Sequence, residues 1–259
     1  MTMGAELVKR PTRWAKRLGE IVLDQLYPPQ CLHCDAPISQ ADTLCAACFR
    51  LLRPITAPLC PRLGIPFEVS LGPDALSAEA IADPPPFERS RSAVLYNDLA
   101  SGIVSRLKYG DRPELARFCA RLMAGAGAEF WGESPVLVPV PLHRSRQFQR
   151  RYNQSAELAR ALGAIARVKV DPELVSRVKR TRQQVGLSAD QRQRNVAGAF
   201  AAHAEAIGRT RGRRVVIVDD VITTGSTIKA MTRALQKAGI EKIDVISFAR
   251  VVIGADLPI

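Results

Sequence analysis

The sequence predicts an α/β protein in which helices flank a parallel sheet, with a small cysteine-rich module ahead of the sheet. From residue 89 onward, apolar strand-like runs alternate with amphipathic helical stretches, which is the pattern of a parallel sheet covered by helices. Five of the six cysteines lie between residues 31 and 60. The 259 residues are 47% hydrophobic and 24% charged, which excludes a disordered chain and leaves room for one full domain with an appendage.

The elements of the sheet follow from hydrophobic periodicity and from the residues that bound each run. Short apolar runs predict strands, and longer runs with a helical period predict helices. The last helix is bounded by Gly239, because glycine commonly terminates helices. We expect strands at 93–96, 136–140, 174–178, 215–218 and 243–248, and helices at 99–108, 113–130, 154–166 and 226–238.

The cysteines predict a metal site. Cys31 and Cys34 form one C-x-x-C pair, and Cys45 and Cys48 form a second pair a short distance along the chain. Two such pairs allow four thiolates to meet at one tetrahedral ion, which is typical of structural Zn²⁺. All four ligand positions are then filled by protein, so the metal has no open position for catalysis. Redox-active thiols are the alternative.

These patterns divide the chain into four segments. Cys60 has no cysteine three positions later, where Leu63 stands, so we expect it to be a core residue or the relic of a further pair. The chain beyond it is rich in proline, glycine and serine, which is typical of a linker. The predicted segments are an N-terminal amphipathic helix (1–27), a zinc-binding module (28–62), a linker region (63–88) and the α/β domain (89–259).

The sequence also predicts where the protein resides. Charged residues interrupt the first thirty positions, so no secretory signal is expected there. No stretch approaches the roughly 18 apolar residues that a membrane span needs. We therefore expect a cytoplasmic protein without a membrane span, in which cysteines stay reduced.

The positive charge of the chain is concentrated in one segment. The net charge is +12, and residues 141–214 hold 17 basic and 5 acidic side chains, whereas the remainder is balanced. Such a segment attracts polyanions, either the phosphates of nucleic acid or the clustered phosphates of a small substrate. The alternative is a solvated charged surface.

The run from Arg214 to Thr227 carries the clearest signal of a ligand site. A β-branched strand delivers Asp219 and Asp220 to its carboxyl end, where open α/β sheets bind ligands. The loop that follows is rich in hydroxyls, and Gly225 lets its backbone approach a phosphate at the start of a helix. The two carboxylates suit ribose hydroxyls, either directly or through Mg²⁺.

This run resembles the 5-phosphoribosyl-1-pyrophosphate (PRPP) motif of type I phosphoribosyltransferases, which is an apolar strand, two acidic residues and a T-T-G-x-T loop. The resemblance extends to the ComF family, which joins a zinc-finger module to a phosphoribosyltransferase-like parallel sheet. Arg151 stands where that family often has glycine. The family's other motifs occur in order as Leu107-Lys108-Tyr109-x-Asp111, Val138-Pro139-Val140-Pro141-Leu142-His143, Arg150 with Tyr152-Asn153-Gln154, and Gln183 to Asn195.

The resemblance implies roles for individual residues. Asp219 and Asp220 would be catalytic and contact the ribose, and the loop after them would hold the 5′-phosphate. Arginines after Pro141 would bind pyrophosphate and, with Mg²⁺, stabilise its charge as it leaves. Lys108 is a further candidate, although a lysine there could instead complement the helix dipole. The expected PRPP-binding set is Asp219, Asp220, Val221, Thr223, Thr224, Gly225, Ser226, Thr227, Arg144, Arg146, Arg150 and Lys108.

Residues 179–195 are polar, basic and long for a connection. In phosphoribosyltransferases a flexible loop in this place closes over the substrate and excludes water. The resemblance therefore implies a lid, and a solvated loop is the alternative.

Two functions remain open at this point. The first is a pentosyltransferase, a kind of glycosyltransferase, that moves 5-phosphoribose from PRPP to an unknown acceptor and is linked through its family to DNA uptake and natural transformation. The second is a non-catalytic competence protein that binds single-stranded DNA, or other competence machinery, and retains the PRPP pocket. Single-strand binders usually stack bases on aromatic residues. Residues 141–214 contain only Phe148, Tyr152 and Phe200 of that kind, which favours the enzyme.

Overall fold

The computed structural model describes residues 28–109, 113–143, 152–181, 189–210 and 212–252. The chain divides into two compact units, Met1–Phe49 and Arg50–Ile259, so the division falls inside the predicted 28–62 segment. The predicted N-terminal helix at 1–27 lies outside the described residues. Among the described residues, no helix has the length and apolar character that crossing a membrane requires.

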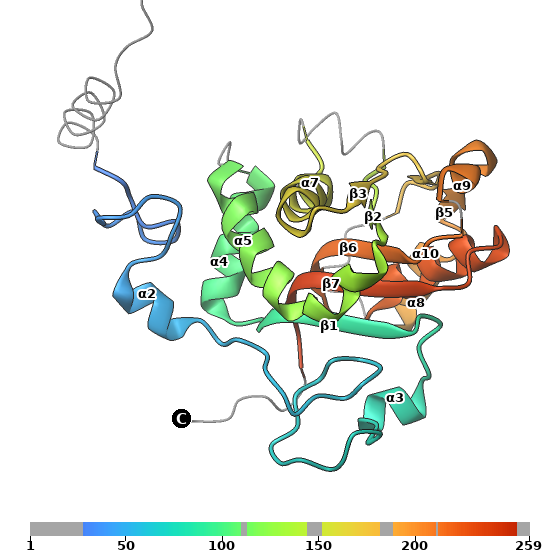
Figure 1. The fold of residues 1–259 in the computed structure, drawn as a ribbon, viewed down its shortest axis with the longest axis horizontal. Helices are drawn as coiled ribbons and strands as arrows, with labels where there is room; N and C mark the ends of the chain where they lie inside the picture. Colours follow the sequence, from blue (N-terminus) through green and yellow to red (C-terminus); the bar gives the residue numbers. More distant parts are fainter. Residues whose placement is uncertain (1–27, 110–112, 144–151, 182–188, 211, 253–259) are drawn as a thin grey trace, which may run out of the picture. The chain divides into compact units, whose positions relative to one another are not determined.

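The second unit is built on a five-stranded sheet with the order β1-β7-β6-β2-β3 (Figure 1). Every neighbouring pair in it is parallel, which confirms the predicted fold class. β6 and β7 lie in the interior of the sheet, where both faces are covered, so nearly all their residues are buried and most of them are apolar. The strands are β1 (Arg89–Leu95), β2 (Val136–Pro139), β3 (Lys169–Val170), β6 (Val215–Ile222) and β7 (Ile243–Arg250).

Helices cover both faces of this sheet (Figure 1). α5 packs on β1 and β7, and α7 packs on β6 and β2, with α4 beside α5. α10 lies on the opposite face, because Ile228 shares an apolar cluster with Val136 and Val138, whereas Leu137 between them lies near α7. The helices of this unit are α3 (Ala78–Ala82), α4 (Asp98–Tyr109), α5 (Pro113–Ala126), α7 (Gln154–Ala166), α8 (Ala189–Val196), α9 (Ala204–Thr210) and α10 (Ser226–Lys237), with a 3₁₀ helix at Ala128–Glu133.

A small antiparallel sheet stands apart from the main one. It pairs β4 (Val175–Arg177) with β5 (Phe200–Ala202), so the strand predicted at 174–178 exists but does not join the parallel sheet. The stretch predicted as a long loop contains α8, which lies against α10. Its sequence is mostly polar, so it has no apolar face that repeats with a helical period. Residues 182–188 of the predicted lid lie outside the described residues.

β1 begins earlier than predicted, because its first half is polar. Arg89 Nη2 donates to the fully buried Asp244 Oδ2 at 2.6 Å, and Ser92 Oγ lies 2.7 Å from Ser247 Oγ. The hydrogen bond to Asp244 also raises the pKa of Arg89. Buried polar groups are tolerated when they are paired in this way. The polar residues at the start of β1 do not predict a strand, because the partners that allow their burial lie in β7, far along the chain.

The outer edge of β1 is covered by the chain that precedes it. Leu95 N donates to Arg53 O at 2.8 Å, Ile55 N donates to Ala93 O at 3.0 Å, and Ser90 N donates to Arg62 O at 2.8 Å. An edge strand with unpaired backbone groups would otherwise be free to pair with another chain. Residues 53–62 therefore close this edge of the sheet.

Candidate functional site

The first unit holds a cluster of four thiols. The Sγ atoms of Cys31, Cys34, Cys45 and Cys48 all lie within 4.8 Å of one another, and the Cys34 and Cys45 sulfurs are 3.7 Å apart. A tetrahedral Zn²⁺ with bonds of about 2.3 Å would require sulfurs about 3.8 Å apart. Burial would raise the pKa of Cys31, but backbone N–H groups of Cys34 and Cys45 outweigh it and lower the pKa to about 6, whereas burial and the neighbouring thiols raise the pKa of Cys48. The spacing of the four sulfurs is what matches the ion. The cluster therefore fits structural zinc.

The second unit places two buried carboxylates at the carboxyl end of β6. Asp219 and Asp220 are 8% and 6% exposed. Ser155 Oγ donates to Asp219 Oδ1 at 3.0 Å. Lys108 Nζ forms an ion pair with Asp220 Oδ2 at 3.0 Å, and Gln154 Nε2 lies 3.4 Å from the same oxygen. The α4 lysine and the start of α7 thus converge on the strand end, and the sequence alone did not predict that Lys108 pairs with Asp220.

The two carboxylates differ in their electrostatic surroundings. Burial, followed by the negative charge of Asp220, raises the pKa of Asp219 to about 7, although hydrogen bonds from the Asp220 N–H and from Ser155 act in the opposite direction. Asp220 has the ammonium group of Lys108 beside it instead. The protonation of a carboxyl group with a pKa near 7 changes when a cation or a hydroxyl group binds beside it.

The Tyr-Asn-Gln motif holds this arrangement together. Tyr152 OH donates to Leu107 O, which ties the start of α7 to the end of α4. Asn153 Oδ1 caps α7 by accepting from Ser155 N at 3.1 Å, and its Nδ2 donates to Val140 O at 3.0 Å. Gln154 then reaches Asp220, and the other end of its amide, Oε1, is buried without a hydrogen-bond partner in the described part of the chain.

Gln154 and Ser155 are site residues to which sequence reasoning assigned no role. The signal was available in part, because Gln154 belongs to a motif of the ComF family. Ser155 follows that motif directly, and its place beside Asp219 becomes visible only when α7 is seen packed on β6.

The loop after β6 has the geometry of an anion-binding turn. Gly225 has φ of +72°, a conformation that favours glycine, and a side chain there would meet only the far end of Lys229. Thr224 Oγ1 and Ser226 Oγ lie 2.8 Å apart at the start of α10. Backbone N–H groups at a helix start attract phosphate. Of the other predicted residues, Thr223 lies in the same turn, Val221 lies near the end of β6 and Thr227 lies in the first turn of α10. Arg144, Arg146 and Arg150 lie outside the described residues.

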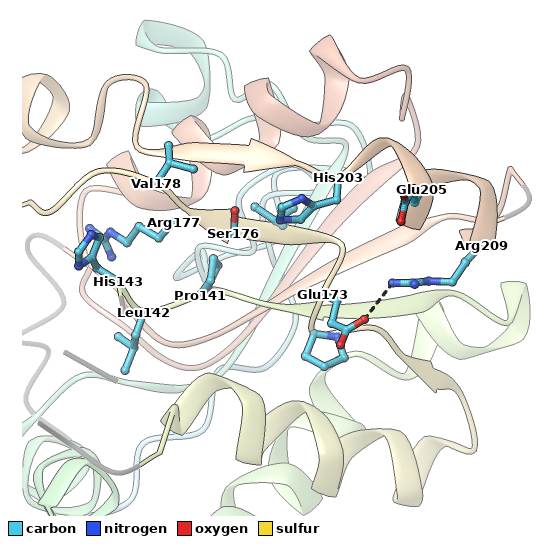
Figure 2. A pocket seen from close by; sticks show the side chains of 12 residues that line it. Pro141, Leu142, His143, Glu173, Ser176, Arg177, Val178, His203, Glu205 and Arg209 are labelled. Carbon is cyan, nitrogen blue, oxygen red and sulfur yellow. Dashed lines mark hydrogen bonds and ion pairs between the residues drawn. The ribbon is translucent and has the colours of Figure 1, made fainter. Parts of the chain in front are cut away.

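A cavity of about 650 Å³ opens beyond the end of β2 (Figure 2). One side is formed by Pro141, Leu142 and His143, and the other by β4, α9 and His203, which lies between β5 and α9. Figure 2 shows His143 beside Arg177, with His203 further along the cavity. Val140 N donates to Val218 O at 2.9 Å, so this mouth and the Asp219 carboxylate lie at the same carboxyl edge of the sheet. The lining also includes Pro172, Glu173, Val175, Ser176, Val178, Glu205 and Arg209.

A parallel sheet that ends in paired carboxylates and a phosphate-type turn defines the phosphoribosyltransferase class of fold, joined here to a four-cysteine zinc module. The family model of the phosphoribosyl transferase domain matches residues 105–256, and that of the double zinc ribbon domain matches residues 22–81. The chain belongs to the ComF family of phosphoribosyltransferase-like proteins.

The relatives agree with this assignment. The chain is 31% identical to the DNA utilization protein YhgH of Escherichia coli K12 over 224 residues, which are 84% of this chain and 95% of the relative. It is 30% identical to Competence protein F of Haemophilus influenzae over 227 residues, covering 85% and 96% of the two chains. A shorter match, 58% identical over 40 residues, links it to hypoxanthine/guanine phosphoribosyltransferase of Methanosarcina mazei and covers 15% and 21% of the two chains.

Proposed function

We propose that the protein binds PRPP together with Mg²⁺ at the carboxyl end of β6 and transfers its 5-phosphoribosyl group to an acceptor. The observation that carries this proposal is the direct succession of Asp219, Asp220 and the Gly225 turn into α10, with Lys108 and α7 gathered on the carboxylates. The 5′-phosphate would lie at the start of α10, and the ribose hydroxyls would face Asp220. Arg144, Arg146 and Arg150 remain our candidates for pyrophosphate.

The transfer itself breaks one bond and forms another. The bond from ribose C1′ to the pyrophosphate oxygen breaks, and its electron pair leaves with pyrophosphate. A lone pair of the acceptor atom forms the new bond to C1′, and the acceptor releases a proton to solvent. Mg²⁺ would supply positive charge to the leaving group, and carboxylate oxygens such as those of Asp220 are the ligands that it prefers.

The cavity of Figure 2 is our candidate for the acceptor site. It lies at the same sheet edge as Asp219, and a volume of about 650 Å³ is within the range of small-molecule pockets. Pro141, Leu142 and Val178 offer apolar surface, and His203 offers a ring nitrogen. This combination suits a planar molecule with polar edges. The reaction would take place in the cytoplasm, which is the location that the sequence predicts.

Calorimetric titration with PRPP and Mg²⁺ tests the proposed function. The double variant Asp219→Ala/Asp220→Ala should lose measurable binding, since each charged hydrogen bond to the ligand is worth about 1.5–3 kcal/mol. Glu68→Ala/Asp74→Ala also removes two carboxyl groups, from exposed positions, and should bind as the wild type does. Equal PRPP affinity in the wild type and the Asp219/Asp220 variant would refute the pocket.

A second candidate function is binding of single-stranded DNA. A groove of about 560 Å³ runs along α10, where Lys229, Arg233 and Lys237 follow one another on one side of the helix. The groove reaches Thr224 and Ser226 of the phosphate-type turn. The names of two relatives refer to DNA utilization and competence. We propose this groove as the path of a phosphodiester backbone if the protein handles DNA.

Salt-dependent binding of a labelled oligonucleotide separates the two candidates. Arg233→Ala/Lys237→Ala should weaken DNA binding and reduce the slope of log affinity against log salt by about 0.7 for each lost contact. The same variant should bind PRPP as the wild type does, because neither side chain belongs to the proposed PRPP pocket. An unchanged slope would exclude the α10 groove as the DNA path.

A further inference from the structure

Two segments of the chain have the same pattern of backbone hydrogen bonds, which we call the frame. In the first, an antiparallel bridge joins Gln30 to Pro37, and in the second a bridge joins Leu59 to Pro66. The bridges are separated by the same number of residues, and the first member of each pair directly precedes a cysteine. The second cysteine is Cys60, for which the proposed function has no use.

The hydrogen bonds around the two turns repeat one another. Cys31 N donates to Ala36 O at 2.8 Å, and Cys60 N donates to Ile65 O at 2.8 Å. The N–H four residues after each cysteine donates back to its carbonyl, at 3.1 Å in the first segment and 2.8 Å in the second. The donor residues, Asp35 and Gly64, have φ of +59° and +64°. This turn is therefore the same zinc knuckle built twice, and Leu63 occupies the place of Cys34.

The second half of the frame is repeated as well. Cys45 N donates to Cys31 Sγ at 3.2 Å just before α2 (Ala46–Leu51). Ser77 N donates to Cys60 Sγ at 3.4 Å just before α3. Ser77 thus occupies the place of Cys45.

The last ligand position follows from the same comparison. Cys48 N lies 3.5 Å from Cys45 Sγ, and Ala80 N lies 3.4 Å from Ser77 Oγ. Ala80 therefore occupies the place of Cys48, and both are buried, at 3% and 6% exposed respectively.

We infer that residues 58–82 are a second zinc ribbon that has lost its metal, so that the chain binds one zinc although its family model is a double ribbon. The four ligand places now hold Cys60, Leu63, Ser77 and Ala80, which offer one thiol, one hydroxyl and two apolar groups. Zn²⁺ in structural sites takes four thiolate or imidazole ligands. The donor set of the second ribbon does not fit the ion.

Apolar packing has replaced the metal as the support of this lobe. Leu63, Ile65 and Ala80 belong to the same buried cluster as Ile217 and Ile228 of the transferase-like fold. The lobe falls in the compact unit that starts at Arg50, whereas the four-cysteine ribbon falls in the unit that ends at Phe49. The second ribbon is thus held by the main core, and only the first depends on zinc.

Metal analysis of the full chain tests the inference. We expect about one zinc in the wild type and about one in Cys60→Ser. We expect about two in the triple variant Leu63→Cys/Ser77→Cys/Ala80→Cys, which restores all four thiols. Cobalt substitution should accordingly double the intensity of the thiolate-to-metal absorption in the triple variant. The matched control Leu63→Ser/Ala80→Ser changes two of the same places without adding thiols and should stay at one.

Each outcome decides the question. Two zinc ions in the wild type, or a loss of zinc in Cys60→Ser, would show that the second ribbon still binds metal and would overturn the inference. A folded triple variant that holds one zinc would overturn the equivalence of the two frames. If the triple variant does not fold, the wild type and Cys60→Ser decide alone. None of these results depends on whether PRPP binds.

Discussion

Asp219 and Asp220 are adjacent in sequence, yet their carboxylates are held by different partners. Asp219 receives hydrogen bonds from Ser155 and from the Asp220 N–H, while Asp220 faces Lys108. Since the two acids lie side by side and are buried, one of them retains its proton to higher pH, and the raised pKa of Asp219 places that proton there. Asp219 is therefore only partly ionised near neutral pH, and the ammonium group of Lys108 lies beside the neighbouring carboxylate.

This proton makes stability depend on pH in a defined direction. The pKa of Asp219 is raised from 3.8 to about 7, so between these values the folded state keeps a proton that the unfolded chain releases. Stability therefore falls as pH rises through this window. Asp219→Asn removes the titration and keeps an oxygen for Ser155 and the Asp220 N–H. Its free energy of unfolding relative to the wild type should increase by about 2 kcal/mol between pH 5.5 and pH 8.

Urea unfolding followed by tryptophan fluorescence measures this difference. Asp74→Asn, at an exposed carboxylate, is the control and should show no such trend. A difference between Asp219→Asn and the wild type that is constant from pH 5.5 to pH 8 would mean that Asp219 is already ionised throughout this range.

At the scale of elements, one side chain both caps α7 and ties its start to the end of β2. Asn153 caps the helix through Oδ1 and holds the end of β2 through Nδ2. Asn153→Ala should cost about 1–2 kcal/mol of stability. It should also weaken PRPP binding, because Gln154 and Ser155 follow directly and contact the carboxylates. Thermal unfolding and calorimetric titration of the same variant measure the two effects.

Asn97 provides a matched control for this prediction. Its Oδ1 accepts from Ala100 N at 3.0 Å and its Nδ2 donates to Leu51 O at 2.9 Å, so it combines a helix cap with a backbone tie away from the carboxylates. Asn97→Ala should cost similar stability and leave PRPP affinity intact. If both variants reduce PRPP affinity equally, the effect reports general loosening rather than the position of α7.

At the scale of the whole molecule, zinc should support one unit and not the other. The four thiols lie within the unit that ends at Phe49, and apolar packing holds the chain from Arg50 onward. Removing zinc with a chelator should therefore increase hydrogen exchange in residues 28–49 and leave exchange in β6 and β7 unchanged. Increased exchange in both strands at low chelator concentration would show that the metal supports the entire fold.

The sequence predicts most of the main sheet because buried parallel strands have an unmistakable apolar run. β6 with its turn, and the four cysteines, follow from local spacing alone. Other features depend on partners that are distant in the chain. The polar start of β1 is a strand because Asp244 pairs with Arg89, and Lys108 reaches Asp220 because Tyr152 ties two helices together. No single window of the sequence contains these pairs.

The second zinc ribbon, at residues 58–82, shows the same limit of prediction from sequence. Cys60 can be read from the sequence as the relic of a pair, as expected above. Ser77 and Ala80 carry no trace of thiol chemistry, so their equivalence to Cys45 and Cys48 appears only when the backbone hydrogen bonds of the two ribbons are compared.

The covered edge of β1 limits how the protein can be shortened. A fragment that begins at residue 89 would contain all five parallel strands, but it would lack residues 53–62, which occupy backbone groups of β1 at Ser90, Ala93 and Leu95. Those groups would become a template for β-pairing between molecules. Such a fragment should self-associate and precipitate on expression. A fragment that begins at Arg50 keeps residues 53–62 paired with β1 and should stay in solution without aggregating. Residues 53–62 thus protect the transferase-like fold from aggregation through the edge of β1.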